Sequence, residues 1–304
     1  MEELFRLYDR SGRIKAIETD TAVTVGVFDG VHRGHQQLLS QLSTFHFPLS
    51  TLVVTLTAHP SFVLGRRDSE YWLDDEEEHL RLLFEAGARY VAVLPFTREV
   101  AQLSACQMAR LLHGKLRMRA LLLGYDSRFG SKQQDDFDRL PLLAEELGFT
   151  IEKGVPFTVD SEPISSSRIR ESLTSGNVEK TAALLGRRYS VTGAVQHGRG
   201  VGHTLGFPTA NIDLSQTRKM LPKEGVYAVN VGSRIGIANL GAAPTFGVDK
   251  PTLEVHLIDY SGDLYGESVT VEFLHRLRDI ERFDSTEALQ QQIQLDLEQT
   301  RQWS

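Results

Sequence analysis

The stretch AVTVGVFDGVHRGHQQLLSQLSTF, residues 22–45, joins an apolar strand to a tight turn and the start of a helix. Valines at alternate positions in residues 23–27 predict a short buried strand, and Asp29-Gly30 indicates a turn. Leucines at helical spacing then predict a helix over residues 34–45. This succession of strand, turn and helix is typical of an α/β domain.

Two histidines, His32 and His35, fall near the first turn of the predicted helix. Free amide N–H groups and the positive end of the helix dipole gather there, so imidazoles beside them can join in binding a phosphate. Gly26 and Gly30 leave the backbone bare where a ligand can approach. A lone histidine at such a position is more often a cap or a surface residue. Zinc binding is disfavoured, because the H-E-x-x-H spacing is absent and the chain has one cysteine.

Composition limits the classes of function. The 304 residues give room for two domains, and 33 Lys and Arg against 40 Asp and Glu leave a net charge of −7. This charge argues against a wide nucleic-acid interface. The single cysteine excludes an internal disulfide, and we find neither a secretory signal nor an apolar run long enough to span a membrane. We therefore expect a cytoplasmic protein without nucleic-acid or membrane partners.

The first half alternates predicted strands and helices, which favours an α/β fold with a doubly wound, Rossmann-like sheet. Ligands bind such a sheet beyond the carboxyl ends of its strands. His59 follows a predicted strand over residues 52–56, and Asp126 follows another over residues 120–124. A structural loop role explains His59 equally well, and Asp126 is also a common turn residue. We assign residues 1–183 to this domain.

The second half changes in texture, because glycine becomes dense and the apolar runs become short and alternating. This pattern predicts a small antiparallel β-barrel over residues 184–304, in which closure removes exposed strand edges. A helix over residues 285–303 is expected to pack against the barrel. The predicted strands cover residues 190–195, 226–231, 235–240, 253–258 and 269–273.

A glycine-rich loop opens this second domain. Gly198, Gly200 and Gly202 stand at alternate positions, so their backbone N–H groups can fold closely around phosphates. The spacing matches neither the P-loop nor the dinucleotide-binding fingerprint. Downstream, Thr209 and Asn211 supply hard neutral oxygens that suit Mg²⁺ bound to nucleotide phosphates.

Motifs in the first half resemble those of nucleotidyltransferases, specifically the adenylylating half of the bacterial riboflavin kinase/FAD synthetases. GVFDGVHRGH, residues 26–35, resembles their G-x-F-D-G-x-H-x-G-H signature, GYDSRFG, residues 124–130, their G-x-N/D-F-x-F-G motif, and ISSSRIR, residues 164–170, their I-S-S-T-x-I-R motif. The resemblance implies that His32 and His35 contact the ATP phosphates and that no covalent enzyme intermediate forms. The further nucleotide-binding residues that it implies are Gly26, Phe28, Asp29, Gly30, Asp126, Ser166, Ser167 and Arg170.

The second half resembles the riboflavin kinases through the glycine loop followed by P-T-A-N, residues 208–211. This resemblance implies that Thr209 and Asn211 hold Mg²⁺. Glu254 lies in TLEVHL, residues 252–257, and points opposite to its apolar neighbours on the predicted strand. A surface role is the ordinary explanation for such a residue, but the resemblance makes it the general base that accepts the proton of riboflavin's terminal hydroxyl. The nucleotide-binding residues implied here are Gly198, Gly200, Gly202, Gly206 and Pro208.

The two resemblances together imply a bifunctional enzyme. Riboflavin and ATP would give FMN and ADP at one site, and FMN and a second ATP would give FAD and pyrophosphate at the other. The chain departs from the family at Thr57-Ala58 and Ser127 in the first half, so a kinase whose first domain no longer adenylylates is the alternative. In the second half, Ala243 stands where the family often has arginine. A flavin-binding regulator without turnover is a third interpretation. The oligomeric state is left open.

Overall fold

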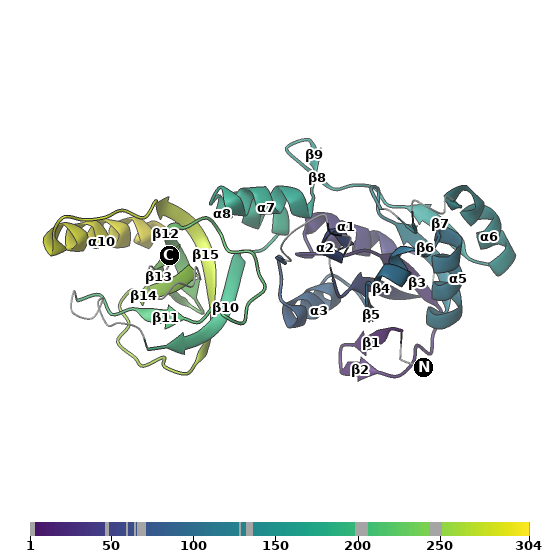
Figure 1. Cartoon of the computed structure of the whole chain (residues 1–304), viewed down its shortest axis with the longest axis horizontal. Coiled ribbons are helices and arrows are strands. Elements are labelled where there is room, and N and C mark those ends of the chain that lie inside the picture. The colour runs from purple at the N-terminus through teal and green to yellow at the C-terminus, as the bar shows by residue number, and fades with distance from the viewer. Residues whose placement is uncertain are drawn as a thin grey trace. The chain divides into compact units, whose positions relative to one another are not determined.

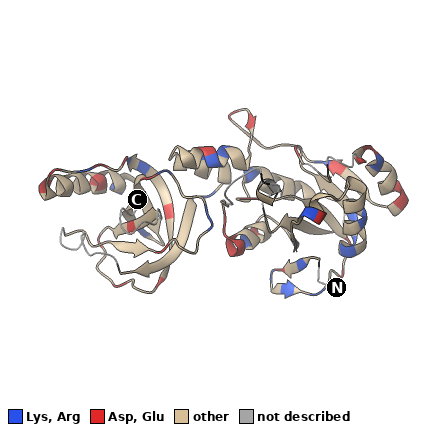
Figure 2. Ribbon diagram, in the orientation of Figure 1, with Lys and Arg blue, Asp and Glu red and all other residues tan. Residues whose placement is uncertain are grey.

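The computed structural model describes residues 4–45, 49–58, 60–63, 65, 71–127, 129–131, 136–197, 206–242 and 251–303. Contacts between residues divide the chain into two compact units, Met1–Ser166 and Ser167–Ser304 (Figure 1). Lys and Arg are interspersed with Asp and Glu along both units (Figure 2). Throughout the described part of the chain, no helix is both long and apolar enough to cross a membrane.

Within its described residues, the first unit is built on a sheet of seven strands in the order β2-β1-β5-β4-β3-β6-β7. β3 pairs in parallel with β4 on one side and with β6 on the other, β4 pairs with β5, and β6 pairs with β7. The strand order therefore reverses at β3, which is the switch point of a doubly wound sheet. β1 and β2 extend one edge in antiparallel fashion. The bounds are β1 Arg6–Asp9, β2 Gly12–Ile14, β3 Thr21–Val25, β4 Ser50–Leu56, β5 Tyr90–Leu94, β6 Met118–Leu123 and β7 Thr150–Lys153.

Helices flank this sheet, and the central strands are buried as a parallel sheet covered on both faces requires. Every residue of β5 is buried, as are the apolar residues of β6. The predicted α/β architecture is confirmed. The bounds are α1 Arg33–Leu42, α2 Pro60–Val63, α3 Glu76–Glu85, α4 Arg98–Ala101, α5 Ala105–Leu116, a 3₁₀ turn Phe137–Arg139, α6 Leu140–Leu147 and a hairpin of β8 Thr158–Val159 with β9 Glu162–Pro163.

The helix α1 ends three residues before the predicted limit at residue 45. The hydroxyl groups of Ser43 and Thr44 donate hydrogen bonds to the backbone carbonyls of Ser40 and Gln41, at 2.6 and 2.7 Å. Serine and threonine compete with helical bonding in this way and favour a turn. The end of the helix is therefore set by these two polar side chains.

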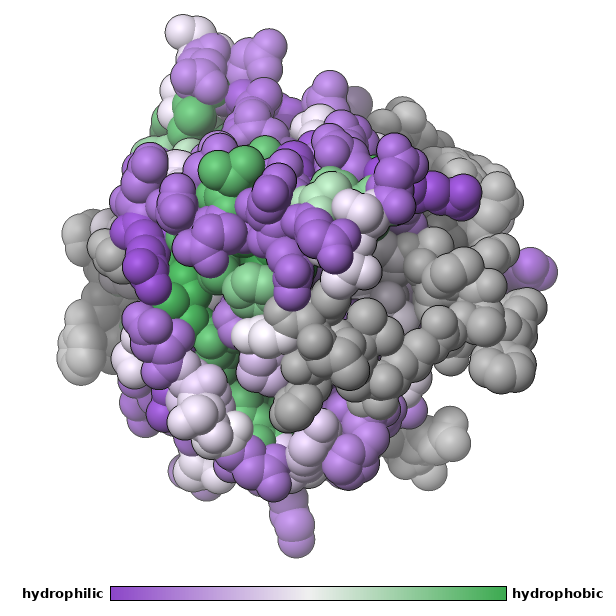
Figure 3. Space-filling model, turned by 90° about the vertical axis from the view of Figure 1, so that its left-hand side faces the viewer, coloured by the Kyte–Doolittle hydropathy of each residue, from purple (hydrophilic) through white to green (hydrophobic). Residues whose placement is uncertain are grey.

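The second unit is a closed barrel in the strand order β10-β11-β14-β13-β12-β15, with helices packed on it. All pairings within the barrel are antiparallel, which confirms the predicted architecture. The face of this unit that carries α10 shows a strip of apolar side chains between hydrophilic ones (Figure 3). The bounds are α7 Ser166–Thr174, α8 Val178–Leu185, β10 Tyr189–Gln196, β11 Ala210–Ile212, β12 Gly225–Val231, β13 Arg234–Ala242, β14 Pro251–Leu257, β15 Ser268–Arg278, α10 Thr286–Thr300 and a 3₁₀ turn Arg301–Trp303.

The helices α7 and α8 join the barrel in the second contact unit. The backbone amide of Lys223 donates to the carbonyl of Leu173 in α7 at 2.9 Å. Glu179 of α8 pairs with His275 of β15. By contacts, both helices therefore lie with the barrel, although α7 precedes the predicted domain boundary at residue 183 and α8 crosses it.

Candidate active sites

The switch point of the sheet is followed directly by the two histidines. His32 is the N-cap of α1, and its Nδ1 accepts a hydrogen bond from the backbone N–H of His35 at 3.3 Å. A ring nitrogen that accepts carries no proton, so His32 is a neutral imidazole protonated at Nε2. Its side chain is buried. The helix start thus fixes both the orientation and the tautomer of His32.

His35 stacks on His32, with ring centroids 3.5 Å apart and planes at 16°. The ring of Phe28 meets His35 edge-on at 5.1 Å. Burial lowers the pKa of His35 well below its usual value, and the neighbouring His32 and His79 lower it further. His35 is therefore neutral at physiological pH. Its Nδ1 is buried and has no hydrogen-bond partner among the described residues, so a ligand can supply one.

A cavity of about 140 Å³ lies against these histidines, at the carboxyl ends of β6 and β7. This is the crevice in which doubly wound sheets bind their ligands. Of the residues expected to act here, His32, His35, Asp126 and Ser166 line it. The cavity thus brings together α1, the loops after β6 and β7 and the start of α7, which are distant in sequence.

The remaining predicted residues of this site lie elsewhere. Gly26, Phe28, Asp29 and Gly30 do not line the cavity. A Cβ on Gly26 would lie 3.1 Å from the Phe28 ring, so this glycine makes room for the ring that orients His35. The carboxylate of Asp29 accepts a hydrogen bond from the backbone N–H of Leu73 at 2.8 Å. The structure therefore gives these four residues positions in the scaffold beside the cavity.

The residues of the serine and arginine motif, residues 164–170, differ in their surroundings. The Ser166 hydroxyl donates to the carbonyl of Asp29 at 3.1 Å, whereas Ser167 is exposed. Arg170 follows Ser166 by four residues in α7 and shares its helix face. His59 lies outside the described residues.

A second cavity, of about 600 Å³, lies in the other unit between the barrel and α10. Apolar residues of the strands and of α10 form much of its lining, with Thr209 and Glu254 among the polar groups. Apolar walls combined with convergent polar groups are typical of a site for an organic ligand.

Polar side chains form a row across adjacent strands at this cavity. Asn211 of β11 and Asn239 of β13 both pair with Glu254 of β14, so the three side chains share one face. Thr209, two residues before Asn211, lines the same cavity as Glu254. The side chains of Thr209, Asn211 and Glu254 make no hydrogen bond or ion pair to any residue that the structure describes. They are available to a ligand or a cation.

The neighbours of Glu254 behave as predicted from the alternation of the strand. Leu253 and Val255 are buried in the barrel, whereas Glu254 and His256 line the cavity. His256 is held by a 2.8 Å hydrogen bond between its Nδ1 and the carbonyl of Pro208. This contact gives His256 and Pro208 a role in holding the loop.

Of the predicted glycines of this site, Gly206 lies in a turn with φ of 84°. Gly198, Gly200, Gly202 and Ala243 lie outside the described residues.

The α10 wall of the cavity is fixed by a buried ion pair, which sequence reasoning missed. Arg278 of β15 contacts both carboxylate oxygens of Asp296 in α10 at 2.8–3.1 Å, and Gln292 donates to the same carboxylate at 2.9 Å. The two partners are 18 residues apart in the sequence. The one sequence signal for this ion pair was the position of Asp296 on the inward face of a mostly polar helix.

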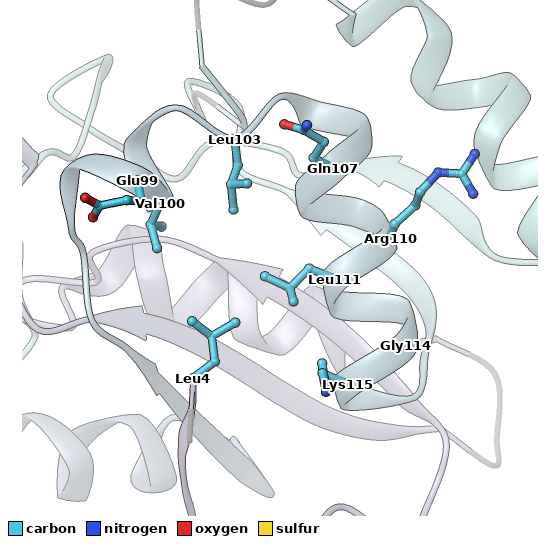
Figure 4. A pocket seen from close by; sticks show the side chains of 9 residues that line it. All are labelled: Leu4, Glu99, Val100, Leu103, Gln107, Arg110, Leu111, Gly114 and Lys115. Atoms are coloured by element: carbon cyan, nitrogen blue, oxygen red, sulfur yellow. The ribbon is translucent and has the colours of Figure 1, made fainter. Parts of the chain in front are cut away.

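An open groove of about 660 Å³ also lies on the first unit, between Leu4, the segment 99–103 and α5 (Figure 4). Its centre is made by apolar side chains such as Leu103 and Leu111. Arg110 points away from these leucines and pairs with Glu146 at 3.2 Å (Figure 4). None of the predicted site residues lines this groove.

Comparison with known proteins assigns a family to each half of the chain. Residues 14–168 match the family model described as FAD synthetase, and residues 185–304 match that described as riboflavin kinase. The bifunctional riboflavin kinase/FMN adenylyltransferase of Haemophilus influenzae is 36% identical over 295 residues, which cover 91% of this chain and 92% of that protein. The chain belongs to the bifunctional riboflavin kinase/FMN adenylyltransferase family.

Other relatives agree. The bifunctional riboflavin kinase/FMN adenylyltransferase of Escherichia coli K12 is 36% identical over 290 residues, covering 93% of this chain and 92% of that protein. A crystal structure from Streptococcus pneumoniae, described as a macrolide-efflux protein, is 31% identical with a TM-score of 0.85, and the match covers 95% of this chain and 96% of that one. That description names another activity, so this likeness supports the fold.

The predicted bifunctional flavin enzyme is thus confirmed, and both catalytic domains are present. The alternative of a kinase alone is disfavoured, because the full-length relatives carry both activities in their names. Residues 169–184 fall between the two family matches. The division of the domains at residue 183 stays a prediction.

Proposed function

We propose that the two cavities are separate active sites, with adenylylation of FMN beside α1 and phosphorylation of riboflavin beside α10. The observation that carries the kinase assignment concerns Thr209, Asn211 and Glu254. Thr209 and Glu254 line a ligand-sized cavity, Asn211 pairs with Glu254 on the neighbouring strand, and the three side chains have no partner among the described residues. For adenylylation, the support is the neutral pair His32 and His35 at the start of a helix, where phosphate is favoured.

At the kinase site, the terminal hydroxyl oxygen of riboflavin attacks the γ-phosphorus of ATP. The bond from this phosphorus to the bridging oxygen breaks, and ADP leaves with the electron pair. Glu254 takes the hydroxyl proton, an assistance typically worth about 10²–10⁴-fold in rate. The apolar lining from the strands and α10 would receive the flavin ring and exclude water. Positioning and charge stabilisation are the main needs of such a transfer.

Mg²⁺ fits the side chains at this cavity. Thr209 and Asn211 offer neutral oxygens, beside the carboxylate of Glu254, and such hard donors suit Mg²⁺ that also binds phosphate oxygens. When bound, the ion would neutralise charge on the ATP phosphates. The chain's own residues orient the acceptor hydroxyl and hold the proton at Glu254.

At the adenylylation site, a phosphate oxygen of FMN attacks the α-phosphorus of ATP, and the bond to the α,β-bridging oxygen breaks to release pyrophosphate. His32 donates from Nε2 and His35 presents its unpartnered ring nitrogen, so both imidazoles stabilise phosphoryl oxygens as charge develops. Ser166, Ser167 and Arg170 contribute further donors from the start of α7. Asp126 lines the cavity and suits a hydroxyl or amino group of the nucleotide.

Product chromatography tests this assignment. The chain is incubated with Mg²⁺ and ATP, once with riboflavin and once with FMN. We expect FMN and then FAD from riboflavin, FAD from FMN, and no product after chelation of the metal. Absence of FAD in the FMN incubation would contradict the first site, and absence of FMN in the riboflavin incubation would contradict the second. The single cysteine leads us to infer a reducing compartment, the cytoplasm.

A further inference from the structure

The turn between β3 and α1 is strained. Phe28, Gly30 and Val31 all have positive φ, at 54°, 79° and 37°. Non-glycine residues in this region cost about 1–3 kcal/mol each, and a β-branched residue such as Val31 is a genuine outlier. This turn delivers His32 to the N-cap of α1. Such a conformation persists only where its surroundings hold it.

Two buried carboxylates hold this turn through a reciprocal exchange of hydrogen bonds. Asp29 in the turn accepts from the backbone N–H of Leu73 at 2.8 Å. In return, Asp74 accepts from the backbone N–H of Gly30 at 3.0 Å. The two aspartates are 1% and 3% exposed, which makes each charge-assisted bond strong. We call this pair of segments, residues 29–30 and 73–74, the aspartate clasp.

A histidine completes the clasp from α3. Nδ1 of His79 lies 3.0 Å from Oδ2 of Asp74, and its Nε2 lies 2.9 Å from Oγ1 of Thr55. The Thr55 hydroxyl also contacts the carbonyl of Val27 at 3.0 Å, and a carbonyl can only accept. The one hydroxyl proton therefore goes to Val27, and Nε2 of His79 must donate to Thr55. With Nδ1 donating to Asp74, both ring nitrogens carry protons and His79 is an imidazolium.

The electrostatic surroundings agree with a charged His79. Burial alone would lower the pKa of His79, but the carboxylates of Asp74, Asp29 and Glu78 together raise it above the usual value. On the side of α1, the same cation helps to keep His35 neutral. Oδ1 of Asp74 is buried and has no hydrogen-bond partner among the described residues. The buried negative charge of Asp74 is therefore compensated by His79 and by the backbone N–H of Gly30.

We propose that Asp74 and His79 are positioning residues for adenylylation, which as a buried ion pair hold the Phe28–Val31 turn and so place His32 at the start of α1. The inference rests on the proposed role of His32. Neither residue touches the cavity, so both act through the turn. A misplacement of about 1 Å at a catalytic group can cost 10²-fold in rate, which sets the size of the expected effect.

The ion pair implies a pH dependence whose sign is fixed. His79 is charged below its raised pKa and loses its charge as the pH rises through that value, so the pair is complete at low pH and lost at high pH. Adenylylation should therefore decline on the alkaline side, above the ordinary histidine pKa of about 6.5. Among the described residues, no histidine–carboxylate ion pair lines the kinase cavity, so the kinase reaction should not share this decline.

The test compares His79→Gln, His79→Lys and Asp74→Asn in the full chain. FAD formation from FMN gives kcat and KM for ATP between pH 6 and pH 9.5, and FMN formation from riboflavin is measured in the same preparations. Glu85→Gln is the matched control, since Glu85 lies on the same helix in an exposed pair with Arg81. Thermal unfolding reports the stability of each variant.

We expect His79→Gln and Asp74→Asn to lower kcat/KM for adenylylation about 10- to 100-fold at pH 6.5. Their kinase activity should stay within about two-fold of the wild type, and the alkaline decline of adenylylation should be absent. His79→Lys keeps a cation up to a pH near 10, so it should recover much of the activity and move the decline upward. Glu85→Gln should behave as the wild type.

Several outcomes overturn the inference. One is a wild-type adenylylation profile without an alkaline decline, which needs no variant and stands even if a substitution prevents folding. Another is an unchanged profile in His79→Gln, or an equal fall of both activities. If His32→Asn leaves FAD formation intact, the proposed site itself is wrong. If His32 is required while the His79 variants match the wild type, only the positioning role fails.

Discussion

The two sites differ in how far the protein itself holds their polar groups. Beside α1, the side chains of His32, Asp29 and Ser166 are hydrogen-bonded to backbone groups, and the turn that contains Asp29 and leads to His32 is held by buried charges. At the kinase site, the side chains of Glu254 and Asn211 have no hydrogen bond to any described residue. The first site is thus preorganised by the fold, whereas the second leaves its reactive groups to be ordered by metal and substrates. The difference predicts how each responds to substitution.

The largest effect is expected at the kinase site from Glu254→Gln. The amide keeps the shape of the side chain but cannot accept the hydroxyl proton, so FMN formation should fall about 10²–10⁴-fold. FAD formation from supplied FMN should persist, as chromatography of flavin products would show. Loss of both activities in a folded variant would mean that the sites are not separate.

At the preorganised site, His32→Ala should lower FAD formation about 10²–10³-fold, because a donor to the developing phosphoryl charge is removed. This substitution also removes the N-cap of α1, at a cost of about 0.5–2 kcal/mol. His32→Asn separates the two effects, since asparagine caps helices well but lacks the imidazole. We expect His32→Asn to restore thermal stability without restoring FAD formation, while FMN formation continues in both variants.

The ligand-ordered site should respond strongly to magnesium. Asn211→Ala removes one proposed oxygen ligand, so the Mg²⁺ concentration for half-maximal FMN formation should rise about 10-fold. Asn230→Ala is the matched control, because Asn230 lies on β12 of the same barrel and pairs with Ile235 and Glu272, whereas Asn211 pairs with Glu254. An equal magnesium dependence in the two variants would remove Asn211 from the metal site.

The smallest effect on chemistry is expected at the wall of the kinase cavity. Asp296→Asn breaks the bidentate pair with Arg278 and leaves a mostly buried guanidinium, so the free energy of unfolding should fall by about 3–5 kcal/mol. KM for riboflavin should rise while kcat changes little. The double variant Arg278→Met/Asp296→Leu leaves no unpaired charge and should unfold near the wild-type temperature in calorimetry. A double variant as unstable as Asp296→Asn would show that the pair itself stabilises the fold.

Much of the fold was accessible from the sequence because its signals are local. Buried strands such as residues 90–94 are continuous apolar runs, and the strand predicted over residues 226–231 differs from β12 by one residue. β11 was missed, since three residues within a metal-binding motif give no alternation to detect. The antiparallel edge of β1 and β2 was missed too, as its short strands are half exposed and mostly polar.

Site residues could be predicted where strand alternation fixes the direction of a side chain. They were missed where segments distant in the sequence meet. Alternation along β14 correctly directed Glu254 away from the barrel core. The aspartate clasp joins residues 44 apart, and the acidic run before His79 indicated only a helix start. A histidine that ends a run of five acidic residues was the one available signal. Asp29 was expected to face the nucleotide, and the neighbouring amide of Leu73 explains its inward direction.

The manner in which α1 begins limits the reactions that this end of the sheet can support. His32 has committed one ring nitrogen to a backbone amide, so no lone pair is left there to collect a proton. The ring can donate a hydrogen bond from Nε2 but cannot transfer a proton from one reactant to another. Pyrophosphate departs as a stable anion at neutral pH and needs no incoming proton, unlike an alkoxide or an amine. A capping histidine is therefore sufficient here, and substrates with poorer leaving groups should remain unreacted.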